Sequence, residues 1–211
     1  MAVGRCDPDI ITAIPIQDKF ILYFPNGKDP VLLDSELRCL GKLDARIKSA
    51  YRIKSENGAN FGRNRGIYGS KIYFISEEKD NTREHFLRVA DLSAMLLELG
   101  QPGAEQVSDR VIPTTVLTRN VEEFAISPHN GVLFTLTNSG NIEVLGTGVS
   151  RQLDPDKRYG VEFYSAIGLH RDSLIVAGCC PKTKSYMLFG LTRRLEIKFR
   201  NTYDMPTGSN S

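Results

Sequence analysis

The sequence has no strong charge of either sign and no long apolar run. Its 211 residues include 27 Lys and Arg against 25 Asp and Glu, which leaves a net charge of +2. A nucleic-acid-binding domain usually carries a distinct basic stripe, and this balance is too mild to supply one. A membrane-spanning helix needs roughly 20 apolar residues in succession, and no run approaches that length. We therefore expect a partner that is neither nucleic acid nor membrane.

Cysteine is also scarce, and its placement does not indicate a disulfide framework. The chain has four cysteines, Cys6, Cys39, Cys179 and Cys180. Adjacent cysteines rarely bridge each other, because so short a ring strains the disulfide geometry. We expect Cys179 and Cys180 to be buried at the end of a strand. Residues 1–8 have no apolar core of a secretory signal, so we expect a reducing compartment, either the cytoplasm or the nucleus.

Recognisable catalytic and metal-binding motifs are missing. The three histidines, His85, His129 and His170, have no second ligand at metal-binding spacing. Gly-x-Ser-x-Gly, the phosphate-binding loop and His-Glu-x-x-His do not occur. The sequence therefore predicts no cofactor and no metal, and it favours a non-enzymatic protein.

Residues 121–145 contain the clearest structural pattern. Residues 121–126 alternate as in a half-buried strand, and residues 132–137 are apolar at nearly every position, as in a strand covered on both faces. Pro128 and Gly131 favour a reversal between these strands, and residues 138–141 favour a second one. The pattern predicts three short antiparallel strands in succession.

This pattern recurs along the chain. Four segments have similar strand cores at spacings of roughly 40 to 60 residues, the period of propeller repeats. The predicted units are residues 9–44, 66–117, 118–149 and 158–200, followed by a disordered tail at 201–211. We predict an all-β, propeller-like domain of about four antiparallel sheets, either a closed ring or part of a larger one. A β-sandwich is the main competing fold.

One segment resembles the core of a WD-type repeat. The resemblance rests on residues 124–128, on Asn130 and Gly131, and on residues 137–142. It covers one blade well and the neighbouring units loosely. The chain departs from the family in having no tryptophan and no Gly-His opening. The resemblance implies a β-propeller that serves as a platform for protein partners.

Residues 86–99 fit two patterns. At period 2 they give strands at 85–89 and 95–99 around a turn at Asp91. At period 3.6 their apolar residues share one helical face, and Gly100 would end the helix. The neighbouring units favour the strands.

Arginine precedes the first strand of each predicted unit. These residues are Arg5, Arg65, Arg119 and Arg158. In a propeller they would rim the docking face, where bidentate hydrogen bonds suit an acidic peptide or a phosphate. The alternative is that they only solubilise loops.

Two functions remain open from the sequence. The first is a scaffold that docks a protein partner, possibly an acidic one, and that self-associates if the ring is open. The second is a carbohydrate-binding or glycoside-hydrolysing domain with carboxylates such as Glu123 and Glu162 on the central axis.

Overall fold

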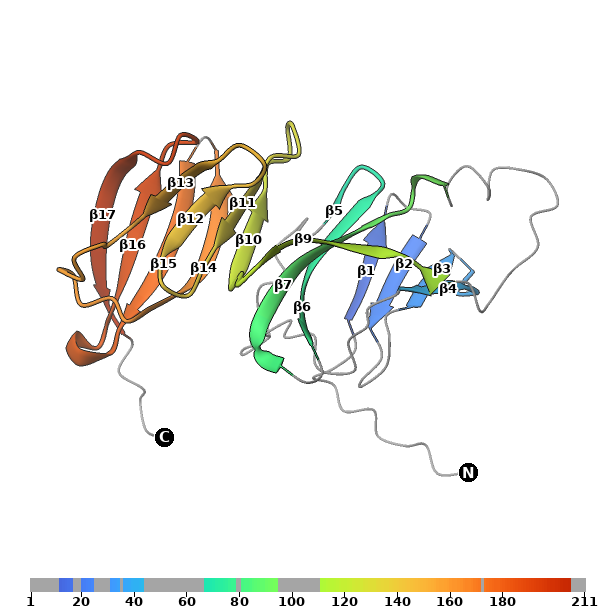
Figure 1. The fold of residues 1–211 in the computed structure, drawn as a ribbon, viewed down its shortest axis with the longest axis horizontal. Coiled ribbons are helices and arrows are strands. Elements are labelled where there is room, and N and C mark those ends of the chain that lie inside the picture. The colour runs from blue at the N-terminus through green and yellow to red at the C-terminus, as the bar shows by residue number, and fades with distance from the viewer. Residues whose placement is uncertain are drawn as a thin grey trace, which may run out of the picture. The chain divides into compact units, whose positions relative to one another are not determined.

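The computed structural model describes residues 12–16, 20–24, 31–34, 36–43, 67–78, 81–94, 111–171 and 173–205. Within these ranges the chain forms four sheets whose strands are almost entirely antiparallel (Figure 1). The prediction of an all-β chain with four antiparallel sheets is therefore confirmed. The chain divides into two compact units, Met1–Arg119 and Asn120–Ser211. Among the described residues, no helix has the length and apolar character needed to cross a bilayer.

The first sheet of the N-terminal unit is a four-stranded meander with one added strand. Its order is β1-β2-β3-β4-β8, with β8 parallel to β4 and all other neighbours antiparallel. The strands are β1 (Thr12–Ile16), β2 (Phe20–Phe24), β3 (Val31–Asp34), β4 (Cys39–Leu43) and β8 (Val111–Ile112).

The second sheet of this unit is built around one long strand. Its order is β5-β6-β7-β9, and β7 and β9 lie side by side in Figure 1. The strands are β5 (Ile67–Tyr68), β6 (Lys71–Glu78), β7 (Asn81–Asp91) and β9 (Thr114–Arg119).

Strand β7 covers the first part of residues 86–99, the segment whose sequence fits both a strand pattern and a helix pattern. Residues 85–89 are strand, as the period-2 pattern predicts. The strand stops at Asp91 because its carboxylate accepts a hydrogen bond from the Ser93 N–H (2.9 Å), which turns the backbone away from the ladder. Ser93 and Ala94 then take helical conformation, and the expected strand at 95–99 lies outside the described residues.

The C-terminal unit consists of two four-stranded meanders in chain order. The first contains β10 (Glu123–Ile126), β11 (Leu133–Leu136), β12 (Asn141–Val144) and β13 (Val149–Gln152). The second contains β14 (Phe163–His170), β15 (Ser173–Cys180), β16 (Ser185–Leu191) and β17 (Ile197–Asp204), with a short 3-10 helix at Pro181–Thr183. Strand β17 includes residues 201–204, which the sequence pattern assigns to the tail, because they pair in register with β16.

The local predictions for residues 121–145 are confirmed in this unit. All four residues of β11 are buried, as expected for a strand covered on both faces. The reversal after β10 closes through the Gly131 N–H, which donates to the Ser127 carbonyl (2.9 Å), and Gly131 has a φ of 69°. Gly140, at a φ of 86°, ends the next turn. Glycine suits both positions because its missing Cβ leaves positive φ unstrained.

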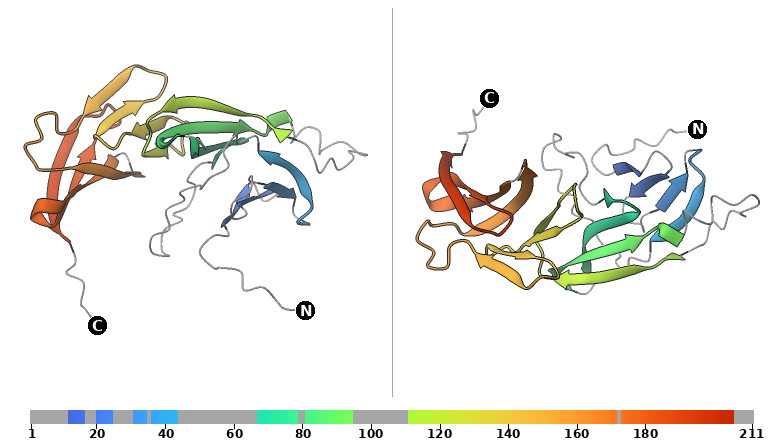
Figure 2. Two further views of the ribbon diagram at one scale, coloured as in Figure 1. Left: turned by 60° about the horizontal axis from the view of Figure 1, so that its bottom comes forward. Right: turned by 90° about the horizontal axis from the view of Figure 1, so that it is seen from above.

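The two sheets of the C-terminal unit pack face to face around one apolar core (Figure 2). The rings of Tyr164 and Phe189 lie 5.9 Å apart between centroids, and Phe134 belongs to the same buried cluster. The first strand of the second sheet, β14, starts against the first sheet, since the Tyr164 N–H donates to the Asn138 carbonyl (2.9 Å). Burial of these large side chains is the main source of stability for the unit.

Candidate functional site

Arg119, one of the four predicted site arginines, is the last residue of β9. It is exposed, and its guanidinium carbon lies 5.6 Å from the centroid of the Phe86 ring on β7. Phe86 is the cross-strand partner of Arg119, so the two side chains share one face of the sheet. No carboxylate among the described residues forms an ion pair with Arg119. Its charge is therefore held over an aromatic ring and is open to a partner.

The structure places a second arginine on this face, and this one is buried. Arg88 lies two residues after Phe86 on β7 and is 7% exposed. Its Nε donates to Ser76 Oγ (3.1 Å), and its Nη1 lies 3.5 Å from Thr114 Oγ1. Its guanidinium carbon is also 6.0 Å from the Phe86 centroid. Phe86 thus lies near two guanidinium groups from neighbouring strands.

A β-bulge brings these side chains to the same face. The pairing of β7 with β9 shifts between Leu87 and Arg88, so that Arg88 pairs with Val116 while Leu87 pairs with Thr118. The extra residue in β9 interrupts the alternation of its side chains, so that Val116 and Arg119 lie on the same face of the sheet. Without it, Val116 and Arg119 would point to opposite faces of a strand with strict alternation. We call Ser76, Phe86, Arg88, Thr114 and Arg119 the arginine face.

Sequence reasoning missed Arg88. The pattern of an arginine before each first strand predicts Arg119, but it does not include an arginine inside an apolar strand. The signal was present, because Arg88 interrupts the apolar run at residues 86–90 at a position where the alternation predicts an inward side chain.

Arg158, the predicted site residue of the C-terminal unit, lies in the connection from β13 to β14. It is exposed, and its Nη2 pairs with Asp156 Oδ2 at 3.0 Å. Its N–H donates to Oδ1 of the buried Asp154 (3.0 Å), which anchors the turn. An exposed ion pair of this kind contributes roughly 0–1 kcal/mol, so Arg158 can exchange Asp156 for another carboxylate.

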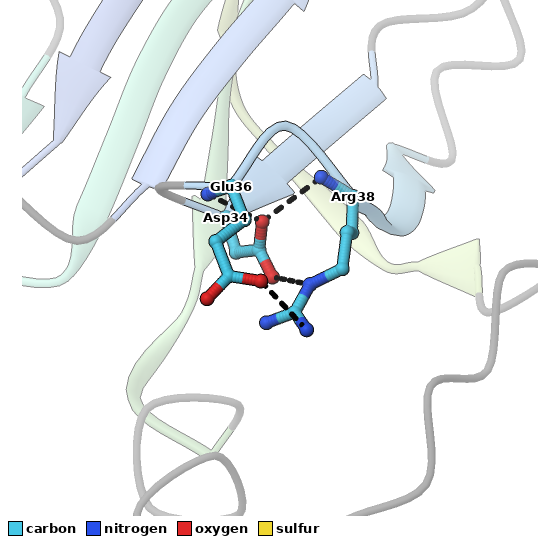
Figure 3. Close-up of polar contacts among 3 residues, drawn as sticks. All are labelled: Asp34, Glu36 and Arg38. Carbon is cyan, nitrogen blue, oxygen red and sulfur yellow. Dashed lines mark hydrogen bonds and ion pairs between the residues drawn. The ribbon is translucent and has the colours of Figure 1, made fainter.

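The same arrangement occurs in the N-terminal unit, between β3 and β4. Asp34 Oδ1 accepts hydrogen bonds from the N–H groups of Glu36 and Arg38, both at 2.9 Å (Figure 3). The Arg38 guanidinium contacts both acids, with Nε 2.7 Å from Asp34 Oδ2 and Nη1 2.9 Å from Glu36 Oε2. Partial burial opposes the effect, but the hydrogen bonds from Arg38 and Glu36 outweigh it and lower the pKa of Asp34. The Arg38 guanidinium is therefore already paired with two carboxylates of its own turn.

The remaining predicted arginines and carboxylates are placed as follows. Arg5 and Arg65 lie outside the described residues. Glu123, at the start of β10, is half-buried, and its Oε1 accepts a hydrogen bond from the Phe124 N–H (3.1 Å). Glu162 is exposed just before β14. Among the described residues of the N-terminal unit, Arg119 therefore lies near Arg88, an arginine that the sequence did not predict.

The cysteines and histidines have environments that fit structural roles. Cys179 and Cys180 are buried free thiols at the end of β15, as the sequence predicts. Burial raises the pKa of Cys179. His129 and His170 are exposed. In the described ranges, no three His, Cys, Asp or Glu side chains come together as a metal site would require.

Comparison with known proteins adds no family to this description. No protein-family model matches the chain, and a search of curated proteins finds no significant match.

Proposed function

We propose that this chain is a non-enzymatic interaction scaffold of the β-propeller type, working in the cytoplasm. Its four sheets would be blades of one domain, which the sequence pattern places at residues 1–200 and which β17 extends to Asp204. The observation that carries the proposal is the packing of the C-terminal unit, where two successive meanders face each other across one apolar core. Successive propeller blades pack in this manner. Fold alone does not determine function, so the charged residues on the surface must also fit a docking role.

The charged surface supports a docking role. Arg119 and Arg158 each stand at a connection into the first strand of a sheet, and both are exposed. Arg119 has no carboxylate partner among the described residues, and the partner of Arg158 is a weak surface pair. Arginine in such positions suits a carboxylate-bearing protein segment, because its planar fork can donate two parallel hydrogen bonds.

The test is capture of partners from a cell extract, quantified by mass spectrometry, with three proteins. These are the wild type, the double variant Arg119→Ala/Arg158→Ala, and the charge-matched control Lys182→Ala/Arg194→Ala at exposed positions of the C-terminal unit. We expect specific partners to be lost with the first variant and kept with the control. Equal capture by all three proteins would remove the docking proposal.

The state of the ring has its own test. If four blades close on themselves, the chain is a monomer in solution. If they do not, the terminal sheets expose faces and edges that favour self-association. The molar mass from light scattering over a range of concentrations separates these cases.

A further inference from the structure

The arginine face contains a buried positive charge that the described residues do not neutralise. Arg88 is more than nine-tenths buried, and the polar groups that reach it are two hydroxyls, Ser76 Oγ and Thr114 Oγ1. Hydroxyls satisfy individual N–H donors but supply no counter-charge. A guanidinium removed from water without an anion is costly, because the desolvation is not repaid.

Two of the three guanidinium nitrogens of Arg88 have hydrogen-bond partners among the described residues. Nε and Nη1 are used by the two hydroxyls, which leaves Nη2 without a hydrogen bond among the described residues. Nη2 is not among the fully buried side-chain atoms without a partner in the described ranges, which are Ser127 Oγ and Tyr164 Oη. The cross-strand neighbour of Arg88, Val116, is 40% exposed on β9, the last strand of its sheet. The sheet is therefore accessible at the position next to Arg88.

A second uncommitted cation lies on the same face. Arg119 stands over Phe86 at 5.6 Å, and Arg88 approaches the same ring at 6.0 Å. Two guanidinium groups around one ring repel each other unless an anion joins them. The bulge in β9 makes this arrangement possible, and bulges are frequent where a strand presents a side chain for binding.

We propose that the arginine face is an oxyanion site, which takes a carboxylate or a phosphate group carried by an acidic segment of a protein partner. Arg88 would bind from the buried side through Nη2 and Arg119 from the exposed side, with Ser76 and Thr114 orienting Arg88. This inference rests on the proposed docking function and names the partner's chemistry at one point of contact. It requires the described residues of the N-terminal unit only.

The experiment follows the Arg88 Nε–Hε resonance in ¹⁵N-labelled full-length protein. The probes are inorganic phosphate, a capped tri-glutamate peptide, a capped phosphoserine peptide and a capped tri-glutamine peptide. Arg88→Lys assigns the resonance and keeps the charge while removing the planar fork. If that variant does not fold, Arg119→Ala, at an exposed position, carries the test alone. Lys42→Ala is the matched control, since Lys42 is an exposed cation on β4 of the same unit.

We expect saturable shifts with the anionic probes and none with tri-glutamine. Loss of one charge-assisted hydrogen-bonding partner in Arg119→Ala should weaken binding about tenfold, and Lys42→Ala should bind as the wild type does. Saturation by both phosphate probes but not by tri-glutamate assigns the phosphate group, and saturation by tri-glutamate assigns the carboxylate.

Two results would overturn the inference. One is the absence of any saturable shift with all anionic probes, and the other is equal binding by Arg119→Ala and the wild type. The proposed function is judged separately by partner capture. Partners lost with Arg119→Ala/Arg158→Ala, despite no binding of the small anions, would end the oxyanion site and leave the scaffold standing. Anion binding without partner capture would support the oxyanion site and remove the scaffold.

Discussion

The backbone of Gly140 lies directly against the ring of Tyr164. A Cβ at position 140 would overlap the ring, with a distance of 2.6 Å to Cδ2 of Tyr164. Gly140 belongs to the turn between β11 and β12, and Tyr164 belongs to β14 of the facing sheet. The contact thus ties a local turn to the packing of two sheets, and it makes the core of the C-terminal unit testable.

Gly140→Ala should destabilise the protein by about 3 kcal/mol. The substitution strains a residue at positive φ, by about 1 kcal/mol, and forces the buried ring to move, by roughly 1–3 kcal/mol. Urea unfolding followed by circular dichroism measures the loss. The matched control is Gly146→Ala, which has a φ of 78° but no atom within 4 Å of its added Cβ. Equal losses for the two variants would mean that the ring contact contributes nothing.

Tyr164→Phe should stabilise the protein, by about 1 kcal/mol. The Tyr164 hydroxyl is buried, and it has no hydrogen-bond partner in the part of the chain that the structure describes. Burial also raises the pKa of Tyr164. Replacing an unsatisfied buried hydroxyl by hydrogen removes its desolvation cost while the ring packing stays. Tyr186→Phe, at a position 42% exposed, is the control and should change little. A less stable Tyr164→Phe protein would reveal a partner such as a bound water.

Asp34→Ala should cost about 1 kcal/mol, whereas Arg38→Ala should cost less than about 0.5 kcal/mol. Asp34 accepts hydrogen bonds from two backbone N–H groups of its turn, which the first variant leaves unsatisfied. Arg38→Ala removes only an exposed ion pair and keeps both backbone hydrogen bonds. Thermal unfolding of the two variants in parallel measures the difference. Equal losses would show that the side-chain pair, rather than the turn, is what stabilises the chain.

Acid should weaken the N-terminal unit through Asp34 and Asp91. Hydrogen bonds from Ser93 lower the pKa of Asp91, and hydrogen bonds from Arg38 and Glu36, against an opposing effect of burial, lower that of Asp34. A carboxyl whose pKa is lower in the folded state stabilises the fold above its unfolded pKa. This contribution is lost as the pH falls through the folded pKa, so we expect a decline below about pH 4.

The measurement for this acid effect is urea unfolding between about pH 2 and pH 7. Asp34→Ala should have a shallower acid dependence than the wild type, because one of the two carboxyls is gone. Identical slopes would contradict the role given to Asp34.

Cys179 and Cys180 should resist alkylation in the native protein. Both are buried, and burial raises the pKa of Cys179, which reduces the reactive thiolate. Cys39 is half-buried and should react before Cys179 and Cys180. Peptide mass spectrometry after iodoacetamide treatment gives the modification of each cysteine, and protein unfolded in urea is the control in which all react. Rapid labelling of Cys180 in the native protein would show that the end of β15 opens.

The turns show where sequence reasoning succeeds and where it fails. The sequence predicts the turn at residues 138–141 from its turn-forming residues, and in the structure Gly140 holds the positive-φ position. Equivalent turns at 34–38 and 192–196 place Leu37 (φ 63°) and Leu195 (φ 65°) at that position. Leucine is disfavoured at positive φ, so the local sequence does not predict these two turns. Leu195 is 1% exposed, and its burial in the core offsets the strain.

The all-β class, the run of short strands and the burial of β11 follow from the sequence, because alternation and turn residues act over a few neighbouring positions. The meeting of Arg88 with Arg119 does not. It depends on the register between β7 and β9, which are joined through a long connection, and on a bulge that no local pattern marks. Register between distant strands is set by packing of the whole sheet. For this reason the sequence identified one arginine of the face, and only the tertiary structure supplied the other.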